Sequence, residues 1–403
     1  METWSVHSLY AESSKILGEN SAKDLQLYSL NLRSKNLPVI FSIGHLSHIT
    51  GSECTFFHQT IQRKREQSNY RIYRISKRSG GFRYIHAVNS KLLEVQKFIN
   101  SHILQKAVPH QASMAYHVGT GGIRHCAQVH CRCRWLFQFD LHDFFWDVTE
   151  IDVFNIFNRL GYRRLLSFEM ARLCTTTHLP RAARSKVLHS HRGFDFSHAE
   201  SSTLPYLRPN FTAIGVLPQG SPTSPMLANL AAYQLDCDLS ELARKHGMVY
   251  TRYADDLCFS LHRDPSKSEI QLIRNSIVKA ISNTGFKVNK KKTRIARPGS
   301  RKEVVGLLVN VDTPLLTRNT RGRIDRFIYA IQKYGIDAVA KHDGFDSSIG
   351  LYNHLQGLVA FACDVDPLHG TAFRERFAAI SCPLTQSCAE PLDSTTDPDG
   401  QQK

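Results

Sequence analysis

Two adjacent aspartates, Asp255 and Asp256, stand between runs of β-favouring residues in the segment VYTRYADDLCFSL, residues 249–261. This pattern predicts a β-hairpin whose turn carries both carboxylates. Aspartate is common in turns, so the pair could simply be two solvated side chains at a hairpin tip. Adjacent like charges repel, however, and a turn needs only one aspartate. A divalent cation would stabilise both charges, and the hairpin alone leaves the two interpretations open.

The 403-residue chain is strongly basic, because 51 Lys and Arg stand against 35 Asp and Glu and give a net charge of +16. Such an excess favours a polyanionic partner, most simply nucleic acid. A membrane surface is the alternative, but we find no long basic amphipathic helix and no run of 18 apolar residues. The N-terminal residues lack a signal-peptide core. We therefore expect a cytoplasmic protein with no membrane partner, whose ten cysteines are mostly reduced thiols.

Periodicity along the chain predicts a mixture of helices and strands, with room for two or three domains or one multi-lobed enzyme. The segment 224–247 is expected to be one strong helix, capped by Ser224 and ended by Gly247. The segment 178–216 is poorly patterned and predicts an extended loop or insertion. The other expected elements are two strands within 70–89, a helix carrying Leu92, Val95, Ile99 and Ile103, a strand at 135–140, and helices at 149–161 and 267–284.

A third acid, Asp140, ends the core-type strand WLFQFD and is followed by Phe144 and Phe145. Phosphoryl transfer with two metal ions needs carboxylates on neighbouring rigid elements, so Asp140 is the natural partner of the aspartate pair. A strand-end aspartate is also a common cap. The segment 217–230, LPQGSPTSPMLANL, offers backbone N–H groups to a phosphate or a base, unless it is a purely structural loop.

These segments together resemble reverse transcriptases, and most closely the retron-type bacterial enzymes and related antiphage defence enzymes. Retron enzymes carry Asn-Ala-x-x-His and Val-Thr-Gly elements where this chain has Cys126 and Val305 in place of the Asn and the Thr. The segment ISKRSGGFRYI resembles the bacterial fingers, and LQGLVAFACDVDP, less distinctly, the thumb. The motifs that carry the resemblance, in family order, are FDLHDFF (139–145), LPQGSPTSP (217–225), YADD (253–256), GFKVNKKKT (285–293) and VVGLLVN (304–310).

The resemblance implies an α+β right-hand polymerase with a ferredoxin-like palm sheet and a helical thumb. The implied regions are an N-terminal helical extension (1–60), fingers (61–134), a palm (135–310) with the insertion 178–216, a thumb (311–385) and a disordered tail (386–403).

The family pattern also implies roles for individual residues. Asp140, Asp255 and Asp256 match the catalytic acids that hold two Mg²⁺ ions, a cation suited to hard oxygen ligands, and the Leu141 carbonyl would join them. Phe145 matches the steric gate that rejects a ribose 2′-OH. The remaining matches would contact the triphosphate (Lys77, Arg83), the incoming nucleotide and template (Gln219, Gly220), the pyrophosphate as a proton donor (Lys292) and the primer end (Tyr253).

Two further features admit more than one interpretation. The segment HCAQVHCRC, residues 125–133, contains zinc-ligand residue types, but its crowding does not match the usual paired spacing, so packing is favoured. The basic runs at 287–302 and 318–326 are expected to lack compensating acids. They could be solvated faces, but their position beside the proposed duplex channel favours phosphate contact, with Arg318, Arg321 and Arg323 gripping RNA.

The sequence therefore predicts an RNA-directed DNA polymerase that copies a structured noncoding RNA into cDNA from dNTPs, in antiphage defence and with a possible effector protein as partner. Three alternatives stay open. A group II intron-type enzyme usually continues into a DNA-binding and nuclease region, for which we find no counterpart after residue 385. A silent RNA-binding scaffold would not need the three acids. The third alternative is template-independent, protein-primed or RNA synthesis at the same site. The expected gate at Phe145 is the feature that discriminates template-independent or RNA synthesis from the predicted activity.

Overall fold

The computed structural model describes residues 4–77, 80–180 and 214–386. The chain forms two compact units, each described by itself below. The first contains Met1–Cys126 and Arg134–Gly299, and the second contains Ala127–Cys133 and Ser300–Lys403. Most of the expected 178–216 insertion and nearly all of the expected tail lie outside the described residues. The boundaries of fingers, palm and thumb stay predictions.

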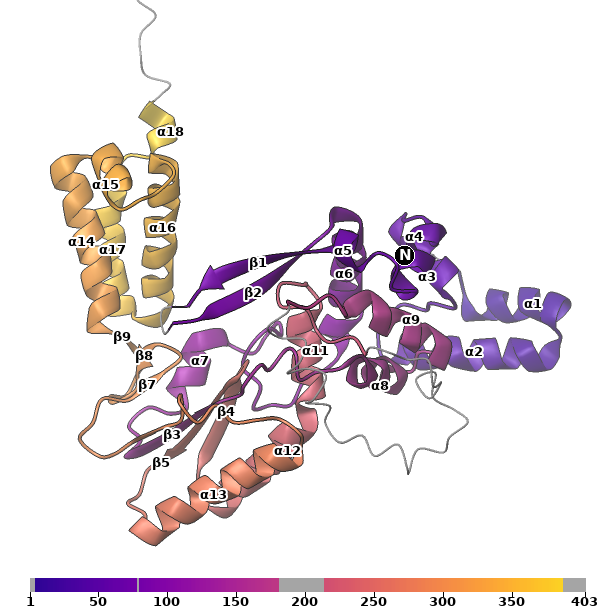
Figure 1. Cartoon of the computed structure of the whole chain (residues 1–403), viewed down its shortest axis with the longest axis horizontal. Coiled ribbons are helices and arrows are strands. Elements are labelled where there is room, and N and C mark those ends of the chain that lie inside the picture. The colour runs from indigo at the N-terminus through magenta and orange to yellow at the C-terminus, as the bar shows by residue number, and fades with distance from the viewer. Residues whose placement is uncertain (1–3, 78–79, 181–213, 387–403) are drawn as a thin grey trace, which may run out of the picture. The chain divides into compact units, whose positions relative to one another are not determined.

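The first unit begins with helices and a long hairpin. The hairpin is antiparallel, pairs Tyr70 with Val88 and Ser76 with Phe82, and turns at Gly80 and Gly81, which both have positive φ (Figure 1). Its two strands confirm the prediction for 70–89. The elements up to this point are α1 (Val6–Leu17), α2 (Glu19–Ser34), α3 (Ile43–Thr50), α4 (Cys54–Ile61), α5 (Glu66–Asn69), β1 (Tyr70–Ser76) and β2 (Phe82–Val88).

A four-stranded antiparallel sheet follows, in the order β4-β5-β3-β6. With helices between β3 and β4 and between β5 and β6, this order is that of a ferredoxin-like βαββαβ sheet, as predicted. The strand over 135–140 and the YADD hairpin are both confirmed. The strands are β3 (Trp135–Asp140), β4 (Val249–Tyr253), β5 (Asp256–Leu261) and β6 (Arg294–Ala296).

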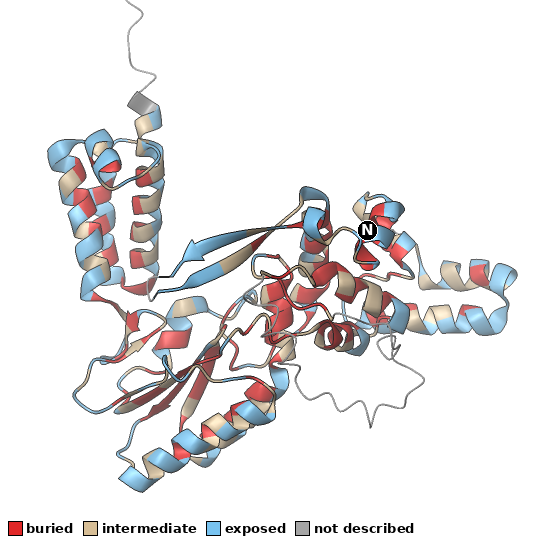
Figure 2. Ribbon diagram, in the orientation of Figure 1, coloured by how far each residue is buried: buried red, intermediate tan, exposed pale blue. Residues whose placement is uncertain are grey.

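The helices of this unit bury apolar faces in one core, which Figure 2 shows as red inner faces. The prediction for 149–161 holds in detail: Thr149 caps α8 in a reciprocal capping box with Asp152, and Gly161 ends it in a left-handed conformation. The helix after β2 buries Leu92, Val95 and Ile99 as expected. These helices are α6 (Ser90–His102), η1 (Leu104–Lys106), α7 (Gly122–Gln128), α8 (Glu150–Leu160), α9 (Arg164–Cys174), α11 (Ser224–Ala231), α12 (Tyr233–Lys245) and α13 (Lys267–Asn283).

The single helix predicted over 224–247 is wrong, because the chain breaks at Ala232 into α11 and α12. The predicted cap is wrong as well. Thr223 precedes the helix, and the Ser224 hydroxyl instead donates to the Pro218 carbonyl at 2.7 Å. Gly247 does follow the end of α12 with φ +64, where a left-handed residue is favoured.

The second unit combines a small antiparallel sheet with a group of helices. The short segment Ala127–Cys133 belongs to it because Arg132 donates its main-chain N–H to the Val309 carbonyl at 2.9 Å. The helical character predicted beyond residue 311 is confirmed for α14 onward, but one strand of the sheet, β9, lies within this region. The elements are β7 (Glu303–Val304), β8 (Leu307–Leu308), β9 (Leu315–Leu316), α14 (Arg318–Tyr334), α15 (Ile336–His342), α16 (Ser348–Val365), α17 (Pro367–Ala378) and α18 (Pro383–Gln386).

No helix within the described residues is long and apolar enough to span a membrane. The cysteines of this part of the chain are all free thiols.

Candidate active site

The three predicted acids meet at one end of the central sheet. Asp140, the last residue of β3, lies opposite Asp256, the first residue of β5, in the strand register. Asp255 occupies the turn between β4 and β5, and its carbonyl accepts the Leu141 N–H at 2.9 Å. The fold therefore brings together carboxylates that are more than 100 residues apart in the sequence, at the ends of rigid strands.

The turn that carries Asp255 has an unusual backbone. Tyr253 pairs with Asp256, so Ala254 and Asp255 form a two-residue connection, and Ala254 has φ +57. A positive φ at the first central residue is typical of a type II′ turn, where glycine is usual. Ala254 is 95% buried, with only 5% of its surface exposed. The surrounding structure must therefore hold this turn in place.

The charges of the three acids are incompletely compensated. Burial, followed by repulsion from Asp140, raises the pKa of Asp255. Burial, followed by repulsion from Asp255 and then from Asp140, raises the pKa of Asp256 to about 6. Although the Asp256 residue as a whole is exposed, its carboxylate faces this cluster of like charge. Asp255 and Asp256 are therefore easier to protonate than isolated aspartates, and a cation would stabilise their charges.

Two residues of the GFKVNKKKT segment hold Asp140. The Lys292 ammonium lies 2.5 Å from one carboxylate oxygen, and the Asn289 side-chain amide donates to the other at 2.9 Å. Asn289 also donates its main-chain N–H to the Asp140 carbonyl at 2.8 Å. Lys292, which the resemblance implies is a proton donor to the pyrophosphate, here contacts a carboxylate of the acidic cluster. Asn289 was not predicted, although it lies within the motif that identified Lys292.

The donor chemistry of this cluster fits a hard divalent cation. Carboxylate oxygens are the ligands that Mg²⁺ prefers, and burial followed by mutual repulsion raises the pKa values of Asp255 and Asp256. Within the described residues, however, no three His, Cys, Asp or Glu side chains are already grouped closely enough to hold a metal ion. The Lys292 ammonium forms an ion pair with Asp140 at this cluster.

The predicted nucleotide-binding residues lie on several elements of the first unit. Arg83, on β2, is exposed. Burial and the charge of Asp140 raise the pKa of Asp255, and the positive charge of Arg83 offsets part of this rise. Lys77 lies at the exposed tip of the β1–β2 hairpin, where its N–H and carbonyl bond to Gly81 and Gly80. Phe145 is half-buried, with its ring centroid 5.7 Å from that of Phe144.

The loop before α11 is fixed against β2. His86 donates its main-chain N–H to the Gln219 carbonyl at 2.7 Å. Gly220 has φ +120, and a Cβ atom there would lie 2.8 Å from the His86 carbonyl oxygen. Only glycine satisfies both conditions without a backbone shift. Gln219 and Gly220 therefore lie in close main-chain contact with β2, which explains the glycine of the LPQG segment.

Tyr253, the predicted primer-end residue, is partly buried and its ring centroid is 6.5 Å from that of Tyr116. Tyr116 has φ +68, and burial followed by the charge of Asp255 raises its pKa. Tyr116 was missed, because the segment around it has no periodic pattern.

The predicted RNA-binding arginines belong to the second unit, at the start of α14. Arg321 and Arg323 each lie 2.8 Å from a histidine ring nitrogen, of His369 and His354 respectively. Arg318 is exposed. The expectation that the basic runs lack compensating acids is wrong at three positions, where acids pair with Lys292, Arg301 and Arg326.

The segment considered for zinc is divided between the two units after Cys126. The Cys126 sulfur lies 3.5 Å from the Thr251 hydroxyl, and burial raises its pKa to about 11. Cys131 contacts the Ala127 carbonyl at 3.8 Å. These contacts agree with the packing interpretation.

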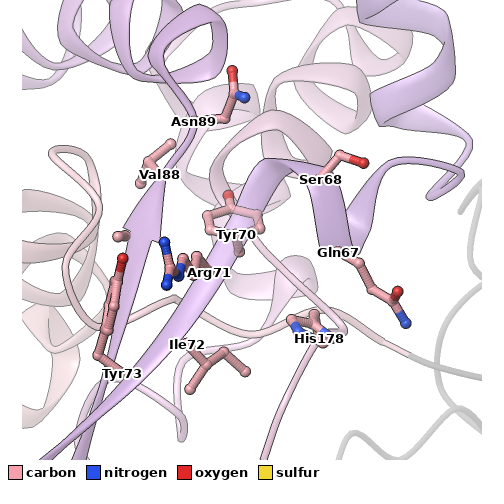
Figure 3. A pocket seen from close by; sticks show the side chains of 10 residues that line it. Gln67, Ser68, Tyr70, Arg71, Ile72, Tyr73, Val88, Asn89 and His178 are labelled. Carbon is pink, nitrogen blue, oxygen red and sulfur yellow. The ribbon is translucent and has the colours of Figure 1, made fainter.

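A separate pocket of about 630 Å³ lies beside β1 and contains none of the predicted site residues (Figure 3). Its wall includes Arg71, whose guanidinium is 5.0 Å from the Tyr73 ring centroid, and His178. The acidic cluster, rather than this pocket, carries the predicted chemistry.

Residues 75–311 match the family model described as reverse transcriptase (RNA-dependent DNA polymerase). The chain belongs to this family. The reverse transcriptase domain so defined contains all three acids and both strands of the YADD hairpin, and family membership confirms the expected right-hand polymerase fold class.

Among curated relatives, the reverse transcriptases named for retrons are similar to this chain. The retron Mx65 enzyme of Myxococcus xanthus is 30% identical, over 77% of this chain and 65% of its own length. The retron Mx162 enzyme of the same species is 29% identical, over 79% and 61%. The retron Ec86 enzyme of Escherichia coli is 26% identical, over 84% and 89%. The chain thus spans less than two thirds of the two Myxococcus relatives.

Proposed function

We propose that this reverse transcriptase is an active RNA-directed DNA polymerase that makes cDNA from dNTPs. The observation that carries the proposal is the meeting of Asp140, Asp255 and Asp256 at the end of the central sheet, within the matched reverse transcriptase domain. A protein that only bound RNA would have no use for three mutually repelling carboxylates, which oppose folding unless a cation offsets them.

Mg²⁺ is the proposed cofactor, as two ions held by Asp140 and Asp255 with help from Asp256 and the Leu141 carbonyl. When bound, it supplies electrostatic stabilisation of the charge that develops on the transferring phosphoryl group. Lys292 lies within reach of this region through Asp140, and in our proposal it donates a proton to the pyrophosphate once that carboxylate is occupied.

The substrate contacts follow from the elements that surround the acids. Arg83 and Lys77 on the β1–β2 hairpin would bind the triphosphate, with the guanidinium giving forked contacts. Gln219 and Gly220 would contact the nucleotide and the template, and Phe145 would exclude the ribose 2′-OH. Tyr253 would support the primer end.

A structured noncoding RNA is the proposed template and primer, and antiphage defence with an effector protein is the proposed role. The similarity to reverse transcriptases named for retrons supports this, together with the net charge of +16. Sequencing the nucleic acid that co-purifies with the protein tests the first part. Plating efficiency of phages on cells with and without the gene tests the second, since a defence protein lowers it.

The central experiment is primer extension on an RNA template with the variant Asp255→Asn/Asp256→Asn. Asparagine preserves shape and removes charge, so we expect incorporation to fall by about 1,000-fold or more. The melting temperature should be unchanged or higher, because repulsion is relieved. The control is Asp264→Asn, which removes an exposed acid paired with Arg134. Parental cDNA synthesis by the double variant would refute the assignment.

A further inference from the structure

Arg252 lies on β4, three residues before the catalytic Asp255, and it is fully buried. Its main chain is fixed on the side away from β5. The Arg252 N–H donates to the Ala112 carbonyl at 2.7 Å, and its carbonyl accepts the Met114 N–H at 2.8 Å. These main-chain hydrogen bonds therefore hold Arg252 in place independently of its side-chain contacts.

The guanidinium is held by the two helices that follow the LPQG loop. Asp236 on α12 accepts two forked hydrogen bonds, from Nε at 2.8 Å and from Nη2 at 2.6 Å. Asn229 on α11 accepts a third, from Nη1, at 2.9 Å. The Tyr250 hydroxyl also donates to Asp236 at 2.8 Å. This network keeps the orientation of the guanidinium plane fixed.

A fourth hydrogen bond of the guanidinium reaches the active-site turn. Nη1 also donates to the Ala254 carbonyl at 3.1 Å. That carbonyl belongs to the peptide unit that joins Ala254 to Asp255, and Ala254 is the residue with the unfavourable positive φ. Fixing this peptide plane fixes the direction in which the Asp255 side chain leaves the main chain.

We propose that Arg252, anchored by Asp236 and Asn229, is a positioning residue that holds the Ala254–Asp255 turn in its catalytic geometry. The inference rests on the proposed polymerase function and adds to it the link between the α11–α12 helices and the acid pair. Because α11 follows the LPQG loop and α12 follows α11, the network connects the side of the nucleotide-binding loop with the turn that carries Asp255.

Stability alone does not explain this network. A fully buried ion pair contributes little net stability compared with apolar residues of the same volume, because both charges lose their hydration. A planar guanidinium can reach Asp236, Asn229 and Ala254 together, since its donors point in several fixed directions. A lysine ammonium at the same place could keep the ion pair with Asp236, but it would lose the two parallel hydrogen bonds that the guanidinium makes. The arginine is therefore needed for geometry.

The test compares Arg252→Lys with an apolar replacement, Tyr250→Phe/Asp236→Leu/Arg252→Met, which removes both charges and the dependent hydroxyl. The matched control is Arg263→Lys, which breaks a forked but exposed pair with Glu269. Each protein is assayed for kcat and KM on an RNA template, and for the rise in melting temperature that Mn²⁺ or Mg²⁺ produces.

We expect both Arg252 variants to lose about 100-fold in kcat, the loss typical of a reacting group misplaced by about 1 Å, with KM for dNTP changed less than three-fold. Their cation-induced rise in melting temperature should shrink, while the control keeps both properties. Parental kcat and cation response in either folded Arg252 variant would overturn the proposal. A parent protein without polymerase activity would instead overturn the proposed function, and the cation response would still decide the role of Arg252.

Discussion

Glu150→Gln should lower the free energy of unfolding by about 3 kcal/mol, because Glu150 is the centre of a buried charge network. The side chain is fully buried at the start of α8. It accepts hydrogen bonds from Arg63 Nη2 at 2.6 Å, from Arg172 Nε at 2.8 Å and from the Gly215 N–H at 3.0 Å. Glutamine has the same shape but leaves two mostly buried guanidinium groups without this counter-charge.

The expected loss of unfolding free energy depends on the hydrogen bonds that each arginine keeps in the variant. Breaking a buried pair by removing one partner typically costs about 3–5 kcal/mol. Arg63 retains Glu66 at 2.8 Å, and Arg172 retains the Ile61 carbonyl at 2.8 Å, so we take the lower end of that range. With a urea m-value of about 3 kcal/mol/M, the transition midpoint should fall by about 1 M.

The assay is equilibrium urea unfolding followed by circular dichroism, with Glu269→Gln as the control. Glu269 also forms a forked pair with an arginine, Arg263, but on the surface, where such pairs contribute about 0–1 kcal/mol. A loss below about 1 kcal/mol for Glu150→Gln would refute the reasoning, since the buried pair would then behave like the exposed one.

The same network predicts a pH dependence. The two arginines hold the pKa of Glu150 below its usual value, against the effect of burial. Its contribution to stability is therefore complete above the unfolded-state pKa of about 4.3, and is lost as the pH falls through the lower folded-state pKa. Glu150→Gln has no carboxylate at this position and so lacks this contribution. The difference in the free energy of unfolding between parent and variant should therefore become smaller below about pH 4.

Three further outcomes are expected. Phe145→Ala should allow ribonucleotide incorporation; continued rejection as strong as in the parent would place the gate elsewhere. Gly220→Ala should cost about 1–3 kcal/mol of unfolding free energy and raise KM for dNTP, because φ +120 and a main-chain carbonyl 2.8 Å from the new Cβ force the loop to shift; an unchanged melting temperature would contradict this. Neutralising three arginines of α14 should weaken RNA binding in filter-binding assays. The slope of the logarithm of the binding constant against the logarithm of the salt concentration should become less steep by about 2. An unchanged slope would show that RNA is recognised by another part of the chain. These three arginines are Arg318, Arg321 and Arg323.

Local patterns were sufficient to predict the strands that carry the acids. Alternation in WLFQFD and in the two arms of the YADD hairpin gave their bounds, and the order of the motifs indicated which acids would meet. The capping box of α8 was equally visible, because Thr149 and the acids that follow are adjacent in the chain. Whether these acids bind metal and catalyse is still a prediction.

The prediction of a single helix over 224–247 is wrong because residues far away in the sequence determine the local structure there. A straight helix through 224–247 would separate the Cα atoms of Asn229 and Asp236 by about 10.5 Å along its axis. Both side chains bond to the single guanidinium of Arg252, and the break at Ala232 lets them do so. Helical periodicity contains no information about a buried arginine on a later strand, so the break could not be predicted.

The pairing of Thr176 with Val216 has a consequence for how this chain can vary. Each residue donates its N–H to the carbonyl of the other at 3.0 Å, and Glu150 ties the adjacent Gly215 to the start of α8. The two chain ends that leave this point are thus fixed side by side by the fold itself. Closing a longer loop between fixed ends costs only about 0.6 kcal/mol for each doubling of its length. Related chains can therefore differ in length here, and a reporter domain whose termini lie close together can be inserted here, with little effect on the folding of the sheet.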